Sequence, residues 1–163
     1  MADVVMTGGN VRALALVLMV AVMVPPLARA QAKADFSGTW TIVPGSGQPN
    51  GVGGLGQKFT AVQTAKTITI TNTLPIVGQT TTIYNLDGSP STNTIKVGPM
   101  SAERVSTLLW EERTLVINSV VTAPNIATRT MQVWRIENGE FVAEQTSGDG
   151  ARKEITHARY RKN

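Results

Sequence analysis

The sequence predicts an all-β protein, a closed antiparallel up-and-down β-barrel of eight to ten strands. After residue 31, apolar and polar residues alternate with the period of two that characterises a β-strand, and β-branched residues are frequent on both faces. The connections between these runs are too short for a helical crossover. Because no helix is available to cover a sheet face, closing the sheet on itself buries one side of every strand. A β-sandwich is the alternative architecture.

Turn residues divide the alternating sequence into short runs. The expected strands are residues 38–43, 57–63, 67–72, 80–86, 94–97, 105–110, 113–120, 128–136, 140–146 and 153–160. The clearest hairpin is at Asn138-Gly139, because both residues tolerate the positive φ angles of a type I′ turn. Such short turns favour strands that pair with their neighbours in the sequence.

Residues 1–30 have the features of a cleavable secretory signal peptide. Arg12 precedes an unbroken apolar run at 13–24, two prolines follow, and residues 28–30 read Ala-Arg-Ala, a small-x-small cleavage site. The run is shorter than the ~20 residues of a membrane-spanning helix. We therefore expect a periplasmic or secreted protein without a stable membrane anchor after cleavage. Its first residue would be Gln31, with Asp35 as an alternative start.

The mature chain, residues 31–163, has 163 − 30 = 133 residues, which is the size of one domain. It contains no cysteine, so a disulfide framework, a thiol nucleophile and a lipidated cysteine are all excluded. Loss of Asp3, Arg12 and Arg29 changes the formal net charge from +4 to 4 − 2 + 1 = +3. Basic residues are scattered except at residues 159–162, which argues against a nucleic-acid-binding protein.

Residues 51–56 match the Gly-x-Gly-x-x-Gly pattern of dinucleotide-binding proteins. That motif requires a helix immediately after it, whose amides face the pyrophosphate. Residues 57–60 read as a strand instead, so we expect no nucleotide cofactor. The glycine-rich segment 45–56 is expected to be a mobile loop, and a flap over a barrel mouth if it has a function.

The segment Gly38-Thr39-Trp40, the loop after it, the run of hairpins and a last strand with two arginines resemble the lipocalin and fatty-acid-binding (calycin) barrels. The resemblance implies that Trp40 plugs one end of the barrel and that Arg159 or Arg161 packs across its ring. Residues 36–40, 84–89 and 160–162 are also similar to a group of short exported bacterial proteins described as lipocalin-like. Even spacing independently places Trp40 on one face with Phe36 and Ile42.

Four residues are candidates to line an internal cavity: Tyr84, Trp110, Gln132 and Trp134. The two tryptophans lie late in strands whose same-face neighbours mix polar and apolar residues, as in a lined cavity. Tyr84 shares its face with Thr82 and Leu86. The alternative interpretation is that these aromatic residues belong to the core or to the surface.

The sequence contains no complete catalytic or metal-binding motif. His157 is the only histidine, so it cannot form part of a histidine pair for zinc. No Gly-x-Ser-x-Gly nucleophile motif occurs, and Glu111-Glu112 are adjacent strand residues whose side chains point apart. We therefore expect no catalytic residue, no metal and no cofactor.

The function that these observations favour is binding of a small apolar or amphipathic molecule inside an exported barrel. Two alternatives remain open. One is a periplasmic protein-interaction or inhibitor barrel that acts through its loops, and the other is an enzyme with an acid–base site in the barrel cavity.

Overall fold

The computed structural model describes residues 32–49, 51–74, 78–97, 100–124, 126–148 and 153–163. These residues contain ten strands, which confirms the predicted all-β fold. The strands are Gly38–Ile42 (β1), Lys58–Gln63 (β2), Thr67–Leu74 (β3), Gly78–Asn85 (β4), Ser91–Val97 (β5), Met100–Glu111 (β6), Thr114–Ala123 (β7), Ile126–Glu137 (β8), Glu140–Ser147 (β9) and Glu154–Lys162 (β10). The predicted signal peptide and its cleavage site lie outside the described residues.

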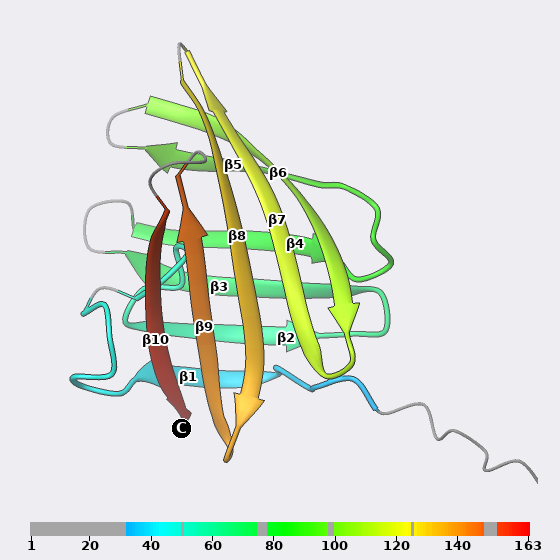
Figure 1. Ribbon diagram of the computed structural model, residues 1–163, viewed down its shortest axis with the longest axis vertical. Coiled ribbons are helices and arrows are strands. Elements are labelled where there is room, and N and C mark those ends of the chain that lie inside the picture. Colours follow the sequence, from blue (N-terminus) through cyan, green and yellow to red (C-terminus); the bar gives the residue numbers. More distant parts are fainter. Residues whose placement is uncertain (1–31, 50, 75–77, 98–99, 125, 149–152) are drawn as a thin grey trace, which may run out of the picture. The chain divides into compact units, whose positions relative to one another are not determined.

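All strand pairs are antiparallel, and the sheet order is β4-β3-β2-β1-β10-β9-β8-β7-β6-β5. Every strand pairs with its sequence neighbours, apart from β4 and β5, and β1 pairs with β10 so that Trp40 lies opposite Lys162. This order describes an up-and-down barrel that is nearly closed. Figure 1 shows β7–β10 crossing over β1–β4, and one continuous group of buried side chains lies in the interior.

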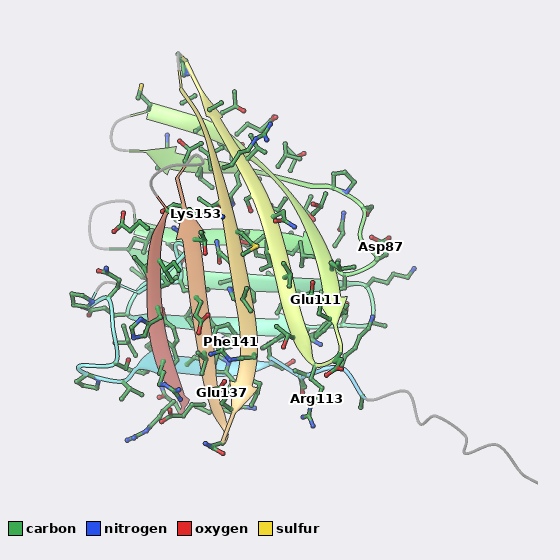
Figure 2. The ribbon with its side chains drawn as sticks, viewed as in Figure 1. Asp87, Glu111, Arg113, Glu137, Phe141 and Lys153 are labelled. Carbon is green, nitrogen blue, oxygen red and sulfur yellow. The ribbon has the colours of Figure 1, made fainter. Side chains whose placement is uncertain are left out.

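Aromatic rings dominate the buried interior, and Phe141 on β9 lies at their centre (Figure 2). Its ring centroid lies 5.2–5.8 Å from those of Phe36, Trp40, Phe59, Trp134 and Tyr160. Most of these pairs are edge-to-face or tilted, the arrangement that the ring quadrupoles favour, and each such pair contributes about 0.5–1.5 kcal/mol beyond area burial. Because the rings come from β1, β2, β8, β9, β10 and, for Phe36, the segment before β1, the cluster joins both groups of strands.

Trp40 is buried, as its face with Phe36 and Ile42 predicts. Its indole Nε1 donates a hydrogen bond of 2.9 Å to the carbonyl oxygen of Phe36. The cation above the ring is Lys162, whose Nζ lies 5.6 Å from the ring centroid. The structure thus places a lysine where the resemblance implied an arginine.

Arg159 and Arg161 instead point to the outer face of β10, because they alternate with the inward residues Ala158 and Tyr160. Arg159 pairs with Glu137 at 3.1 Å and with Glu140 at 3.5 Å, and Arg161 pairs with Glu140 at 3.1 Å. A hydrogen bond from Arg135 is the main reason why the pKa of Glu137 lies below its ordinary value. These ion pairs are half-exposed, so each adds little to stability.

The Asn138-Gly139 turn joins β8 and β9 in the predicted manner. The φ angles are 52° and 81°, so both central residues are left-handed, as a type I′ turn requires. This turn preserves the twist of the hairpin and sets its register, in which Glu137 faces Glu140.

The burial of both tyrosines predicts an unusual alkaline titration. Tyr84 and Tyr160 are the only tyrosines, and burial raises the pKa of Tyr84 above 10.0 and that of Tyr160 to about 12. The unfolded chain would ionise near 10.0, so these groups leave the free energy of unfolding unchanged below that pH and lower it as the pH rises from 10.0 toward 12. We expect the ultraviolet absorbance of tyrosinate to appear well above pH 10.0. If tyrosinate absorbance appears near pH 10.0 while circular dichroism shows that the protein is still folded, the burial of the two tyrosines is contradicted.

Candidate functional site

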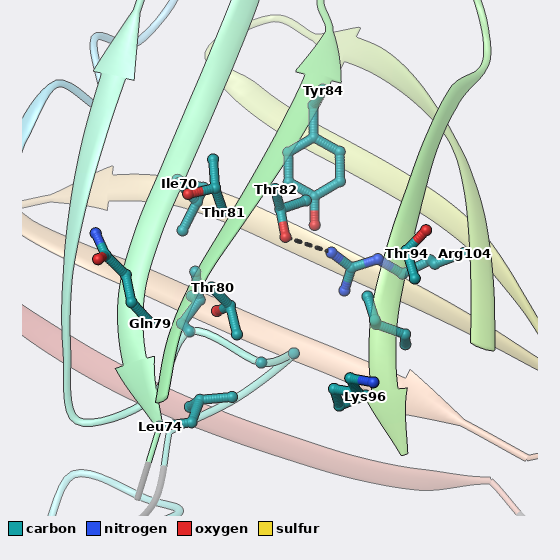
Figure 3. A pocket seen from close by; sticks show the side chains of 14 residues that line it. Ile70, Leu74, Gln79, Thr80, Thr81, Thr82, Tyr84, Thr94, Lys96 and Arg104 are labelled. Atoms are coloured by element: carbon teal, nitrogen blue, oxygen red, sulfur yellow. Dashed lines mark hydrogen bonds between the residues drawn. The ribbon is translucent and has the colours of Figure 1, made fainter. Parts of the chain in front are cut away.

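A pocket with a volume of about 360 Å³ lies between β4 and β5 (Figure 3). Its walls come from β4, β5, the end of β3, one residue of β6 and the glycine-rich loop. The lining residues are Gly53, Gly54, Leu55, Ile70, Leu74, Gln79, Thr80, Thr81, Thr82, Tyr84, Thr94, Ile95, Lys96 and Arg104.

The pocket passes through the barrel wall. On β4, burial alternates so that Thr80, Thr82 and Tyr84 face inward while Gln79 and Thr81 face outward. Residues of both sets line the same pocket. In a fully paired sheet, residues of opposite faces are separated by the backbone, so they can share a pocket only where the wall is open.

The wall is open there because β4 and β5 are the two edge strands of the sheet. Among the residues that the structure describes, side-chain hydrogen bonds join these two strands at one end only. Asn93 accepts a hydrogen bond from the backbone N–H of Ile83 and donates one to its carbonyl oxygen, each 2.9 Å long. The hydroxyl of Ser91 accepts from the N–H of Asn85 at 2.6 Å. The pocket begins where these hydrogen bonds end.

Arg104 on β6 is the only charged residue among the buried residues that the structure describes, with 8% of its surface exposed. Its Nη2 donates a 2.9 Å hydrogen bond to the hydroxyl of Thr82, and its Nε is buried without a hydrogen-bond partner. The ion pairs of the described residues involve Arg135, Arg159 and Arg161, and none of them includes Arg104. The pocket wall therefore carries a positive charge that no carboxylate of these residues neutralises.

Tyr84 lies next to this guanidinium, whose carbon is 5.6 Å from the centre of the tyrosine ring. Burial raises the pKa of the Tyr84 hydroxyl, and the nearby Arg104 charge opposes that rise only in part. The hydroxyl is therefore neutral at physiological pH. On its other side, the ring makes an edge-to-face contact with Trp134 at 5.7 Å.

The glycine-rich loop closes the pocket from within the barrel, which corrects the prediction of a mobile flap. Val52 and Leu55 are each only 2% exposed and belong to the core. The N–H of Val52 donates to the Tyr160 hydroxyl at 3.3 Å, and the amide of Asn72 donates to the carbonyl oxygen of Gly54. Two apolar anchors and these hydrogen bonds hold the loop inside the barrel.

Gln132, which is hydrogen-bonded to Trp134, packs closely against Gly53 of this loop. The φ angle of Gly53 is 63°, and a Cβ atom there would overlap the side-chain amide of Gln132. That amide accepts a 3.0 Å hydrogen bond from the indole Nε1 of Trp134. Gln132 and Trp134 are therefore packed core residues and do not line the pocket.

Trp110 lies elsewhere, in contact with the segment before β1. Its ring stacks on Phe36 with centroids 5.9 Å apart, and Lys33 Nζ lies 5.3 Å from the indole. Its Nε1 is buried without a partner. Of the four predicted cavity residues, the structure thus brings only Tyr84 to the pocket.

Arg104 and Thr82, which give the pocket its charge and its hydrogen bonding, were not singled out from the sequence. The expected strand 105–110 began one residue too late to include Arg104. A signal was nevertheless present, because Ala102, Arg104 and Ser106 continue the inward alternation of β6. An arginine at an inward position of a strand is unusual enough to mark a site.

No protein-family model matches this chain, and the search of curated proteins also gave no match. The lipocalin resemblance thus concerns fold, and the nearly closed antiparallel barrel is compatible with it. Among the described residues, no helix has the length and apolar character of a membrane span, and no three histidine or acidic side chains are grouped as metal ligands.

Two glycine substitutions test whether the loop is packed as described. Alanine at Gly53 or Gly54 would meet a similar left-handed backbone cost of about 1–2 kcal/mol. At Gly54 the nearest atom to an added Cβ is Arg104 Nη1 at 4.0 Å, whereas at Gly53 the methyl group would displace Gln132. We expect Gly53→Ala to lower the free energy of unfolding by about 1–3 kcal/mol more than Gly54→Ala, by analogy with overpacked cores. Equal losses in urea denaturation would contradict the buried position of the loop.

Proposed function

We propose that this protein binds a small amphipathic anion in the pocket between β4 and β5, with the anionic group of the ligand on Arg104. The observation that carries this proposal is the buried, unpaired guanidinium in the pocket wall. Removing a charge from water without a partner is costly, and such groups are normally paired. A carboxylate bound there would supply the missing partner through strong charge-assisted hydrogen bonds.

Thr82 adds a second donor for the same anion. Its oxygen already accepts a hydrogen bond from Arg104, and its own proton remains available. Thr80 differs, because its hydroxyl donates to Asn72 and so offers only acceptor capacity to the pocket. The donors for an anion are therefore concentrated near Arg104, and acceptors lie toward Asn72.

The remaining walls fit a ligand body of mixed character. Leu55, Ile70, Leu74 and Ile95 supply apolar surface, and threonines supply hydroxyl groups. The volume of about 360 Å³ lies at the small end of ligand pockets. A compact amphipathic anion therefore matches this pocket in size and in the character of its walls.

The export prediction places this activity in the periplasm or outside the cell. Packing in the described residues supports Gln31 over Asp35 as the first residue after cleavage. Ala34 is buried, and its carbonyl oxygen accepts a 3.0 Å hydrogen bond from the side chain of Gln63. Processing after Ala34 would remove both the methyl group and this acceptor.

Replacing Arg104 with methionine tests the proposed function. We expect calorimetric titration of the native protein to show that octanoate binds at least about tenfold more tightly than octanol, and Arg104→Met to abolish this preference. Because the variant no longer buries an uncompensated charge, its free energy of unfolding without ligand should rise by roughly 1–3 kcal/mol.

Arg129→Met is the matched control, because Arg129 is an exposed arginine of β8 and its loss gives the same change in net charge. It should leave both octanoate affinity and stability nearly unchanged. Unchanged octanoate affinity in Arg104→Met, or no octanoate binding to the native protein at any concentration below that of micelles, would overturn the proposal.

A further inference from the structure

The pocket runs along a stretch of β4 that pairs with β3 on one side and has no partner strand on the side that faces β5. Both hydrogen bonds between Ile83 and Asn93 use backbone groups of Ile83, so these groups point toward the gap between β4 and β5. In an antiparallel strand, residues two apart point their backbone groups to the same side. Thr81 and Gln79 therefore direct their N–H and C=O groups into the gap, and both residues line the pocket.

The side chain of Asn93 already shows what this edge binds. Its primary amide accepts from the N–H of Ile83 and donates to the carbonyl oxygen of the same residue, which is how a peptide group of a neighbouring strand would pair. At Thr81 and Gln79, no described residue supplies an equivalent group. An unpaired strand edge is a template for a further strand.

The charge in the pocket lies at one end of this free edge. Arg104 lies opposite Asn93 in the pairing of β5 with β6, and its guanidinium reaches across the gap to Thr82. A chain that extends along β4 from Gln79 toward Thr82 would thus arrive with its end at the guanidinium. Lys96 on the opposite wall is exposed and adds a second positive charge toward the mouth.

From this geometry we infer that the ligand is a short peptide with a free C-terminal carboxylate, bound as an extended strand along β4. This inference rests on the proposed anion site at Arg104. The peptide runs parallel to β4, its amides pair with Thr81 and Gln79, and its carboxylate meets Arg104 and the Thr82 hydroxyl. Its terminal side chain faces Leu55 and Ile70, since both lie on the inner side of the pocket.

The first experiment compares N-acetyl-Ala-Ala-Leu bearing a free carboxylate with its C-terminal amide and with octanoate, by calorimetric titration of the native protein. We expect the acid to bind at least about tenfold more tightly than the amide, because charge-assisted hydrogen bonds are lost with the carboxylate. It should also bind more tightly than octanoate, which cannot pair with the strand edge. If octanoate binds and neither peptide does, the inference is overturned while the proposed function stands. If none of the three binds, both are overturned.

The second experiment removes the hydrogen-bond donor of the edge. Thr81→Pro deletes an N–H that faces the gap, and proline is tolerated on edge strands when the missing N–H is not part of the ladder. We expect it to weaken binding of the peptide acid about tenfold more than it weakens binding of octanoate, which makes no hydrogen bond to the strand edge. Thr81→Val, which keeps the N–H and the shape of the side chain, is the matched control and should leave the ratio of the two affinities as it is in the native protein.

If Thr81→Pro lowers the affinity for the peptide acid and for octanoate equally, the inference is overturned. Such a result would indicate general damage to the pocket and no specific role for the strand edge. If circular dichroism shows that this variant does not fold, the ligand can be changed instead. N-methylation of the two amides that join the Ala-Ala-Leu residues removes the donors on the peptide side. Unchanged affinity of the methylated acid for the native protein would overturn strand pairing, and a tenfold loss would support it.

Discussion

The free edges of β4 and β5 are the constraint on which the rest of the site depends. A barrel of ten strands buries its interior completely only when its first and last edges share a ladder. Here those edges are joined by the side chains of Ser91 and Asn93, over part of their length. The remaining length becomes a hole in the wall, and this hole is where Arg104 meets both solvent and interior.

Close packing of the core confines the pocket to the gap between β4 and β5. The rings around Phe141 fill one part of the interior, and Val52 and Leu55 fill space that would otherwise continue the cavity. The structure thus separates two roles within one sheet. The paired strands bury the packed core, and the unpaired edges carry polar groups of the pocket that the core could not tolerate.

The fold was predictable because strand periodicity and short turns are local properties. Each of the ten expected strands overlaps one of the ten observed strands, although β6 begins five residues before the expected start at residue 105, and the Asn138-Gly139 turn has the expected geometry. The site was less predictable. The position of a residue in the alternation of a strand predicts the face on which its side chain lies, but it does not predict which residues that side chain contacts across the barrel. Trp134 and Gln132 do point inward, but the packed loop at Gly53 separates them from the pocket. The cation over Trp40 depends on the register of β1 with β10, which no local pattern reveals.

The packed glycine loop also imposes an order on folding. Its partners are Tyr160 on β10, Gln132 on β8 and Asn72 on β3, so the residues that hold it are separated by most of the chain. Ordering the loop before these strands have met would cost conformational entropy without any contact in return. We therefore expect the loop to become fully ordered late in folding, once β10 has joined the sheet, although it lies between the first two strands of the sequence.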